Sequence, residues 1–274
     1  MKFEPLNAER AAGHAFRPPA DLGFAAPECL LPLQVSELAH AVAWFPIAVV
    51  RQSATRWCVA ALTGTRELGS VFLDASRRWV APYAPRALRH YPFALADVGH
   101  GNDASQRRKV LCVDRDSDCY LEAPEGVEHA VRFFAEDGRT LSDAVRKRFD
   151  DLLARDREMA AASAAIAALA EAGALAEWRG LRADDGAGEI ALPEGIYRVD
   201  EAALMAVDAA TQQRLTQRRA WGLAYAQLLS MPRVAAFARL VERRGGGRAG
   251  PQRQPPDLRV VEDLFGQDDD TLSF

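Results

Sequence analysis

The residues best suited to chemistry lie together in one segment, Trp79–Phe93. It combines aromatic side chains with polar atoms, two arginines and a histidine, and three prolines stiffen it. The candidate ligand-binding residues are Trp79, Tyr83, Arg86, Arg89, His90 and Tyr91. Flat rings with polar tips and guanidinium donors suit a carboxylate, a peptide or an aromatic ligand. An irregular crossover that covers a sheet, with structurally paired arginines, explains the same composition, so both interpretations stay open.

No motif of a known catalytic or cofactor site appears in its proper context. Residues 245–250 match the spacing of a dinucleotide-binding fingerprint, but they follow an expected helix and enter a proline-rich segment. The histidines show no metal-binding spacing, and no Gly-x-Ser-x-Gly elbow occurs. We therefore expect no metal and no cofactor and assign no catalytic residue. Whether the protein is an enzyme stays open, because residues distant in sequence can still form a triad.

The acidic segment between residues 114 and 125 resembles a calcium-binding loop. Asp114, Asp116 and Asp118 have the right spacing, and Glu125 stands at the twelfth place. However, Cys119 occupies the sixth place, where such a loop needs glycine for its sharp turn, and the flanks resemble strands instead of helices. We therefore interpret the segment as an acidic hairpin turn.

Composition places the chain among ordinary globular proteins. It has 274 residues, of which 49% are hydrophobic, so it can bury a substantial core. The net charge of −4, with acids and bases interspersed, argues against a nucleic-acid-binding protein. The beginning of the chain has no apolar segment behind a basic start, and no window approaches the roughly 18 apolar residues of a membrane span. We expect cytoplasmic folding and no membrane span, with export without a cleaved signal peptide as an alternative.

The four cysteines, Cys29, Cys58, Cys112 and Cys119, form no Cys-x-x-Cys pair. In a reducing compartment they are expected to be free thiols that pack as small apolar residues. A bridge between Cys112 and Cys119 is the alternative if the protein is exported.

Short apolar runs separated by turns predict a strand-rich region up to about residue 134. The expected strands are Ile47–Val50, Trp57–Leu62, Val71–Leu73, Trp79–Val80, Lys109–Val113, Cys119–Leu121 and Val131–Phe134. No helical pattern separates them, so we expect a mostly antiparallel meander. Residues 1–30 are expected to form an extended lead-in, and Ser36 is the expected N-cap of a short helix.

After about residue 138 the pattern becomes helical. Apolar residues recur at steps of 3, 4 and 7 between Leu141 and Leu169. This pattern predicts one long helix that begins after Thr140 or Ser142 and ends near Ala172, before Gly173.

The rest of the chain up to residue 244 predicts two strands and four shorter helices. The strands are Leu175–Trp178 and Ile196–Val199. Asp200 and Asp208 are the expected N-caps of the first two helices, and Pro232 precedes the last. The predicted fold class is α+β, with a strand-rich antiparallel N-terminal half, a helical C-terminal half, one shared core and a flexible C-terminal tail.

The final segment changes character again. Residues 245–257 are rich in Gly, Pro and Gln and predict a linker between a domain over residues 1–244 and a tail over residues 258–274. The tail combines acidic residues with apolar anchors, which are Leu264, Phe265, Leu272 and Phe274. Such anchors favour docking, either on this protein's own body or on a protein partner through an added strand. An uncleaved export signal and disorder are the alternatives.

Five segments carry a resemblance to a known family. They are Phe3–Asn7, Leu33–Leu38, Trp79–Phe93, Gly195–Glu201 and Leu223–Ser230. On these segments the chain resembles the bacterial SapC family over nearly its whole length up to about Glu242, and Trp79–Phe93 is the most specific part. The acidic ending before Phe274 is similar as well.

The resemblance implies an accessory role. The family is named for association with a bacterial surface layer and its export, and relatives lie near genes for flavin-dependent tryptophan halogenase-like proteins and outer-membrane receptors. It supplies no catalytic residues to transfer. We expect a non-enzymatic accessory or binding protein of a surface-layer or export system. The alternative is an enzyme or enzyme subunit, accessory to a halogenase-like system, that binds a peptide, carboxylate or aromatic ligand near Trp79–Phe93.

Overall fold

The computed structural model describes residues 2–98, 108–181 and 190–245 of the chain. It contains a five-stranded antiparallel sheet in the order β12-β15-β4-β5-β3. These strands are β3 (Leu30–Pro32), β4 (Ile47–Arg51), β5 (Trp57–Leu62), β12 (Leu175–Glu177) and β15 (Ile196–Val199). The α+β class is confirmed, with antiparallel sheets mostly in the first part of the chain and the main helices later.

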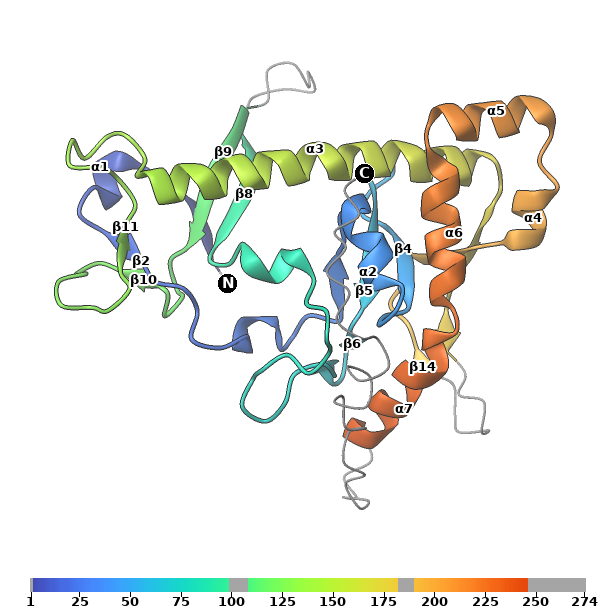
Figure 1. The fold of residues 1–274 in the computed structure, drawn as a ribbon, viewed down its shortest axis with the longest axis horizontal. Helices are drawn as coiled ribbons and strands as arrows, with labels where there is room; N and C mark the ends of the chain where they lie inside the picture. The colour runs from blue at the N-terminus through green and yellow to red at the C-terminus, as the bar shows by residue number, and fades with distance from the viewer. Residues whose placement is uncertain (1, 99–107, 182–189, 246–274) are drawn as a thin grey trace, which may run out of the picture.

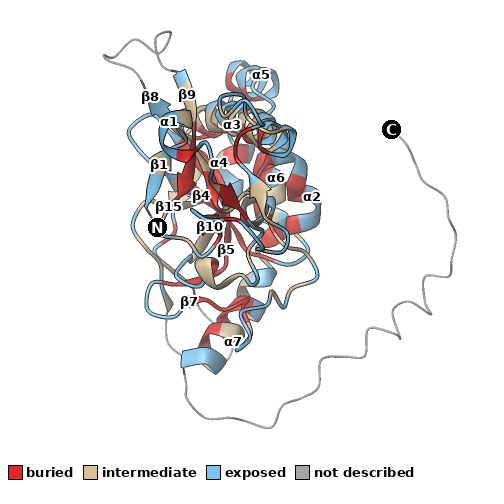
Figure 2. Ribbon diagram, turned by 90° about the vertical axis from the view of Figure 1, so that its left-hand side faces the viewer, coloured by how far each residue is buried: buried red, intermediate tan, exposed pale blue. Residues whose placement is uncertain are grey.

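The centre of this sheet is buried. All six residues of β5 are buried, and so are Ile47, Ala48 and Val49 of the adjoining β4 (Figure 2). Val49 lies opposite Val59, a pair of β-branched side chains that packs well in a sheet. Strand β15, from the later part of the chain, pairs with β4. The sheet therefore joins the two parts of the chain, and the expectation of an N-terminal meander is wrong at this point.

Two smaller sheets lie beside the first, in the orders β1-β9-β8 and β10-β2-β11. Their strands are β1 (Phe3–Pro5), β2 (Ala15–Phe16), β8 (Phe93–Val98), β9 (Arg108–Asp114), β10 (Tyr120–Leu121) and β11 (Val131–Arg132). Two short hairpins pair β6 (Gly64–Thr65) with β7 (Gly69–Ser70) and β13 (Gly180–Leu181) with β14 (Ile190–Ala191). The first 32 residues thus contribute strands to all three larger sheets, whereas residues 1–30 were expected to form an extended lead-in.

Short helical turns connect the strands. They are α1 (Ala8–Ala11), η1 (Gly23–Ala25), η2 (Val35–Glu37), α2 (Leu38–Ala41) and η3 (Arg86–Arg89), where η denotes a 3-10 helix. The expectation that Ser36 is an N-cap is wrong, because Gln34 is the N-cap of η2 and forms a capping box with Glu37. The strands expected near residues 71–73 and 79–80 contribute a single bridge, between Leu73 and Trp79.

Helix α3 (Asp143–Glu171) runs along one side of the body (Figure 1). Its 29 residues give it a length of about 43 Å at 1.5 Å per residue. Ser142 stands at its N-cap and Ala172 at its C-cap. Gly173 follows with a φ of 68°, a left-handed conformation that glycine adopts without strain. The long helix predicted from the apolar pattern is therefore confirmed at both ends.

This helix connects two large clusters of buried apolar side chains. Val145 and Leu152 pack with Phe133 in one cluster, whereas Ile166 and Leu169 pack in the other, which includes β4 and β5 residues. A third, smaller cluster includes residues of β3 and η3. As expected, strands of the first half and helices of the second half share one core, which is the cluster containing β4, β5, α3 and α6 residues, but the cluster around Phe133 lies outside it. A helix of this length extends past a sheet whose strands lie about 4.8 Å apart, so its two ends need different partners.

Four helices follow β15. They are α4 (Glu201–Met205), α5 (Ala209–Gln217), α6 (Ala220–Ser230) and α7 (Arg233–Gly245). As predicted, Asp200 caps α4 by accepting the Ala203 N–H at 3.1 Å, and Asp208 caps α5 by accepting the Thr211 N–H at 2.7 Å. The start of α7 after Pro232 is also confirmed.

Helix α6 is held on the sheet by two buried polar side chains. Gln227 Oε1 accepts the Val199 N–H at 3.0 Å, and Gln227 Nε2 donates to the Ile47 carbonyl at 3.2 Å. Ser230 Oγ accepts the Ile47 N–H at 2.9 Å. These contacts satisfy buried backbone groups at adjoining ends of β15 and β4. They give Leu223–Ser230, one of the five segments that carry the family resemblance, a specific structural role.

Within the described ranges, no helix is long and apolar enough to cross a membrane. All four cysteines are free thiols, and Cys58, Cys112 and Cys119 are buried. Burial raises the pKa of the Cys58 thiol to about 11, so this thiol stays protonated at neutral pH.

Candidate functional site

A buried carboxylate, Glu37, holds the first half of the Trp79–Phe93 segment in place. Glu37 is 1% exposed. Tyr83 Oη donates to its Oε1 at 2.6 Å, and the Arg86 backbone N–H donates to the same oxygen at 2.7 Å. The Gln34 N–H donates to Oε2 at 2.9 Å. A buried charge needs such donors, and here they fix the segment to the η2–α2 turn.

Trp79 and Tyr83 belong to this packed region. The Trp79 indole N–H donates to the Tyr83 carbonyl at 2.7 Å, and the Tyr83 ring stacks on His40 with 5.6 Å between centroids. Burial, together with the hydrogen bond to Glu37, raises the pKa of Tyr83 to about 12. The hydroxyl therefore remains a donor at neutral pH. Neither Trp79 nor Tyr83 lines the cavity that the second half of the segment forms.

The two arginines of the segment lie on η3 with exposed side chains. The Arg89 carbonyl accepts a hydrogen bond from Arg148 Nη1 at 3.2 Å. Neither Arg86 nor Arg89 lines the cavity, and neither forms an ion pair with another residue in the part of the chain that the structure describes. Neither guanidinium group therefore contributes to the wall of this cavity.

His90 and Tyr91, by contrast, line a cavity of about 360 Å³ between the segment and α3. Its walls come from the N-terminal segment, β3, the turn between β4 and β5, β8 and α3. Besides His90 and Tyr91, they are Phe3, Phe24, Ala25, Glu28, Leu30, Leu31, Pro32, Gln52, Arg56, Ala87, Leu88, Phe93, Ala94, Leu95, Leu152, Arg155, Asp156 and Met159. A mostly apolar wall with a few polar groups is typical of small-molecule sites.

Two arginines, Arg56 and Arg155, line this cavity, and Arg155 is the more buried of the two. It is partly buried, and no hydrogen bond or ion pair joins its guanidinium to another described residue. Burial lowers the pKa of Arg155, while the charge of nearby Glu37 opposes that shift. The adjacent carboxylate, Asp156, is bonded instead to Lys109 at 3.0 Å, and Lys109 also contacts Asp97 at 2.9 Å. Arg155 therefore offers a charge that the described side chains do not neutralise directly.

His90 contributes hydrogen-bonding capacity without charge. Burial, and then the positive charge of Arg155, lowers the pKa of His90 to about 4. The imidazole is therefore neutral at pH 7, with one nitrogen able to donate and the other able to accept. Beside it, the Tyr91 ring stacks face to face on Phe24, with centroids 4.0 Å apart. The pair forms a flat aromatic part of the cavity wall.

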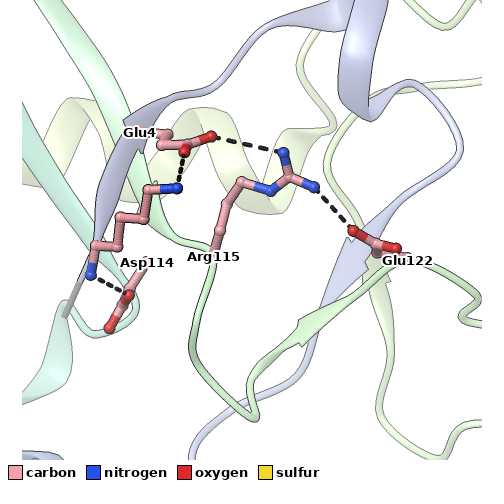
Figure 3. Close-up of polar contacts among 5 residues, drawn as sticks. Glu4, Asp114, Arg115 and Glu122 are labelled. Carbon is pink, nitrogen blue, oxygen red and sulfur yellow. Dashed lines mark hydrogen bonds and ion pairs between the residues drawn. The ribbon is translucent and has the colours of Figure 1, made fainter.

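Tyr91 is anchored behind the cavity by Asp114. Tyr91 Oη donates to Asp114 Oδ2 at 3.0 Å, and the Lys2 backbone N–H donates to Oδ1 at 2.8 Å. Figure 3 shows Asp114 beside an ion-pair chain in which Glu4 and Glu122 flank Arg115. Asp114, the first residue of the calcium-like pattern, thus joins the segment to the N-terminal strand. Among the described residues, no group of three or more His, Cys, Asp or Glu could hold a metal ion.

The cavity includes functional candidates that sequence reasoning did not select, above all Arg155 and Phe24. One signal for Arg155 was available. It lies three residues after Leu152 and four before Met159, so it shares the apolar face of α3 with both. A lone cation on such a face can mark an anion site. Of the predicted linker 245–257, Gly245 ends α7, and the rest lies outside the described residues, as do the anchors Leu264, Phe265, Leu272 and Phe274.

Comparison with known proteins gives one match. The family model described as SapC matches residues 6–237, which cover most of the chain and include the whole cavity lining except Phe3. No curated protein and no solved structure matches.

Proposed function

The chain belongs to the SapC family, and from this premise we propose that it is an accessory binding protein of a surface-layer or export system. Its ligand is a small carboxylate with an apolar or aromatic body, held in the cavity beside Arg155. The observation that carries the proposal is the partly buried guanidinium of Arg155, which has no ion-pair partner among the described residues and faces a mostly apolar cavity.

Electrostatics favour an anion at this position. Two opposite charges 4 Å apart attract by about 4 kcal/mol at an effective dielectric constant of 20, before desolvation is subtracted. A guanidinium also matches a carboxylate geometrically, through two parallel N–H···O bonds. The Glu37 carboxylate already accepts three hydrogen bonds, and Asp156 already forms an ion pair with Lys109. Neither carboxylate therefore requires Arg155 as a partner.

The rest of the cavity wall favours a ligand whose uncharged part is apolar. The stacked Phe24 and Tyr91 rings, together with Leu152 and Met159, offer apolar surface, and neutral His90 adds a hydrogen bond without a competing charge. The volume of about 360 Å³ lies near the lower end of the roughly 300–1,000 Å³ of small-molecule sites. The cavity therefore suits a compact monocarboxylate better than a long chain.

Calorimetry with a matched pair of probes tests the site. We expect 3-phenylpropionate to bind the full chain, and 3-phenylpropionamide, which has the same body without the charge, to bind about tenfold more weakly or worse. Arg155→Gln should remove this preference for the carboxylate. Arg157→Gln, which changes an exposed arginine on the same helix, should keep it.

Equal binding of acid and amide by the unchanged protein, or equal binding of the acid by the Arg155→Gln variant, would refute the carboxylate site. Recovery of a chemically altered probe would support the alternative of an enzyme or enzyme subunit. The accessory role is tested separately, by deleting the gene and measuring surface-layer protein outside the cell. Unchanged export would contradict that role even if the cavity binds carboxylates.

A further inference from the structure

Helix α6 presents an apolar face to the outside of the body. Its inner residues, among them Leu223 and Gln227, are buried. Tyr225 and Leu229 are exposed on the outer side, and Trp221, four residues before Tyr225, is half-buried with one part packed against the main cluster. Tyr225 is 42% exposed and Leu229 is 68% exposed. In Figure 1, α6 runs along one edge of the body between α5 and α7. We call Trp221, Tyr225 and Leu229 the outer stripe.

The outer stripe is extended and ordered by its neighbours. The rings of Trp221 and Tyr225 stack with 6.3 Å between centroids. Met205 of α4 is 65% exposed, and its sulfur lies 3.8 Å from Tyr225 Oη. Large apolar side chains that gather on one surface typically mark an interaction site, whereas scattered ones do not.

The helices next to this stripe carry net positive charge. Residues 209–245, which form α5 to α7, contain seven arginines and one acidic residue, a net charge of +6, and including Asp200, Glu201 and Asp208 around α4 lowers the sum for residues 200–245 to +3. Arg218 and Arg219 precede α6 and Arg233 follows it, and all three are exposed without an ion pair to another described residue. An apolar stripe with cations at both ends fits a partner that carries apolar anchors and negative charge.

Residues 258–274 of the same chain have this chemistry. They contain five acidic residues and one arginine, a net charge of −4, which equals the net charge of the whole protein. The apolar pair Leu264–Phe265 precedes the acidic run Asp268–Asp270, and Leu272 and Phe274 follow it. The negative charge of the tail and its apolar anchors thus complement the cations and the apolar residues of the α6 face.

The segment between α7 and the tail is long enough for the tail to reach α6. Residues 246–257 separate the end of α7 from the tail, and twelve residues can span up to about 40 Å. Helix α6, with 11 residues, is about 16 Å long. A tethered segment also has a high effective concentration, in the millimolar range for a short flexible linker. We infer that residues 258–274 dock on the outer stripe of their own chain, with the acidic run placed against Arg218, Arg219 or Arg233.

A second copy of the chain is a poorer occupant of the same face. Two stripes meeting across a two-fold axis would bring the exposed Arg218, Arg219 and Arg233 of both copies to one interface, which like-charge repulsion opposes. Docking of the tail in the same chain neutralises this charge and covers the stripe. This inference is independent of the carboxylate site.

Photo-cross-linking in the full-length protein tests the docking. p-Benzoylphenylalanine incorporated in place of Tyr225 should cross-link, within a monomer, to peptides from residues 258–274. The same probe in place of Val80, which is 52% exposed and lies outside α4 to α7, should not. Replacing Asp268, Asp269 and Asp270 by Asn should lower the cross-link yield about fivefold or more at low salt.

As a control, replacing the exposed Asp116 and Asp118 by Asn and Glu128 by Gln should leave the cross-link yield unchanged. Cross-links between two copies, no cross-link to residues 258–274, or a yield insensitive to the Asp268–Asp270 change would each overturn the inference. Circular dichroism of every variant checks that the fold is retained.

Discussion

The sharpest structural prediction concerns Glu37, whose buried carboxylate accepts hydrogen bonds from Tyr83, Arg86 and Gln34. Glu37→Gln keeps the shape but supplies one oxygen and one NH₂ group. If the oxygen keeps Tyr83 and Arg86, the NH₂ group faces the Gln34 N–H, and that donor loses its acceptor. An unsatisfied buried donor costs about 1–3 kcal/mol. Loss of the charge also weakens the two remaining bonds, since charge-assisted bonds are roughly twice as strong as neutral ones.

The free energy of unfolding should therefore fall by about 2–4 kcal/mol, measured by urea denaturation at pH 7. Glu171→Gln, at an exposed position at the end of the same long helix that bears Arg155, should change it by less than about 0.5 kcal/mol. In a double-mutant cycle, Glu37→Gln and Tyr83→Phe should show a coupling of about 1 kcal/mol. A Glu37→Gln protein as stable as the unchanged one, or strictly additive effects with Tyr83→Phe, would refute the role given to this carboxylate.

Two further predictions concern α6 and the cavity. Gln227→Leu should lower the free energy of unfolding by about 2–3 kcal/mol, because the Val199 N–H and the Ile47 carbonyl lose a buried partner. Gln213→Leu, at an exposed position, should leave the free energy of unfolding nearly unchanged. Equal losses of stability at both positions would contradict the role given to the Gln227 hydrogen bonds. The pKa of His90 is lowered to about 4 in the folded protein, so as pH falls the His90 imidazole becomes protonated in the unfolded chain before it does in the folded one. His90 therefore contributes stability above pH 6.5 that is lost as pH falls from 6.5 to 4, and His90→Gln should lose less stability over that window in pH-dependent unfolding.

Local chemistry made several elements predictable. The apolar repeat from Leu141 to Leu169 and the left-handed Gly173 set the limits of α3, and Asp200 and Asp208 satisfy backbone N–H groups only three residues away. Such signals act within one or two turns of chain, so they do not depend on the rest of the fold. The α+β class and the family likeness rest on the same kind of evidence.

The candidate site was predictable only in part. His90 and Tyr91, chosen for residue type, line the cavity, whereas Trp79, Tyr83, Arg86 and Arg89 do not. These two groups of candidates lie in different places because Glu37 holds the first half of the segment in a packed region through its hydrogen bond with Tyr83. Glu37 precedes the segment by 42 residues or more. No local pattern in the Trp79–Phe93 segment carries that information.

The sequence by itself determined the limits of α3, the caps of α4 and α5, and most of the strands. Only the tertiary structure decided that β15 pairs with β4, that α3 joins two apolar clusters, and that Arg155 lines the same cavity as His90 and Tyr91. The reason is physical. Caps, turns and periodicity arise from neighbouring residues, but burial and charge pairing depend on side chains that the chain brings together from more than a hundred residues apart.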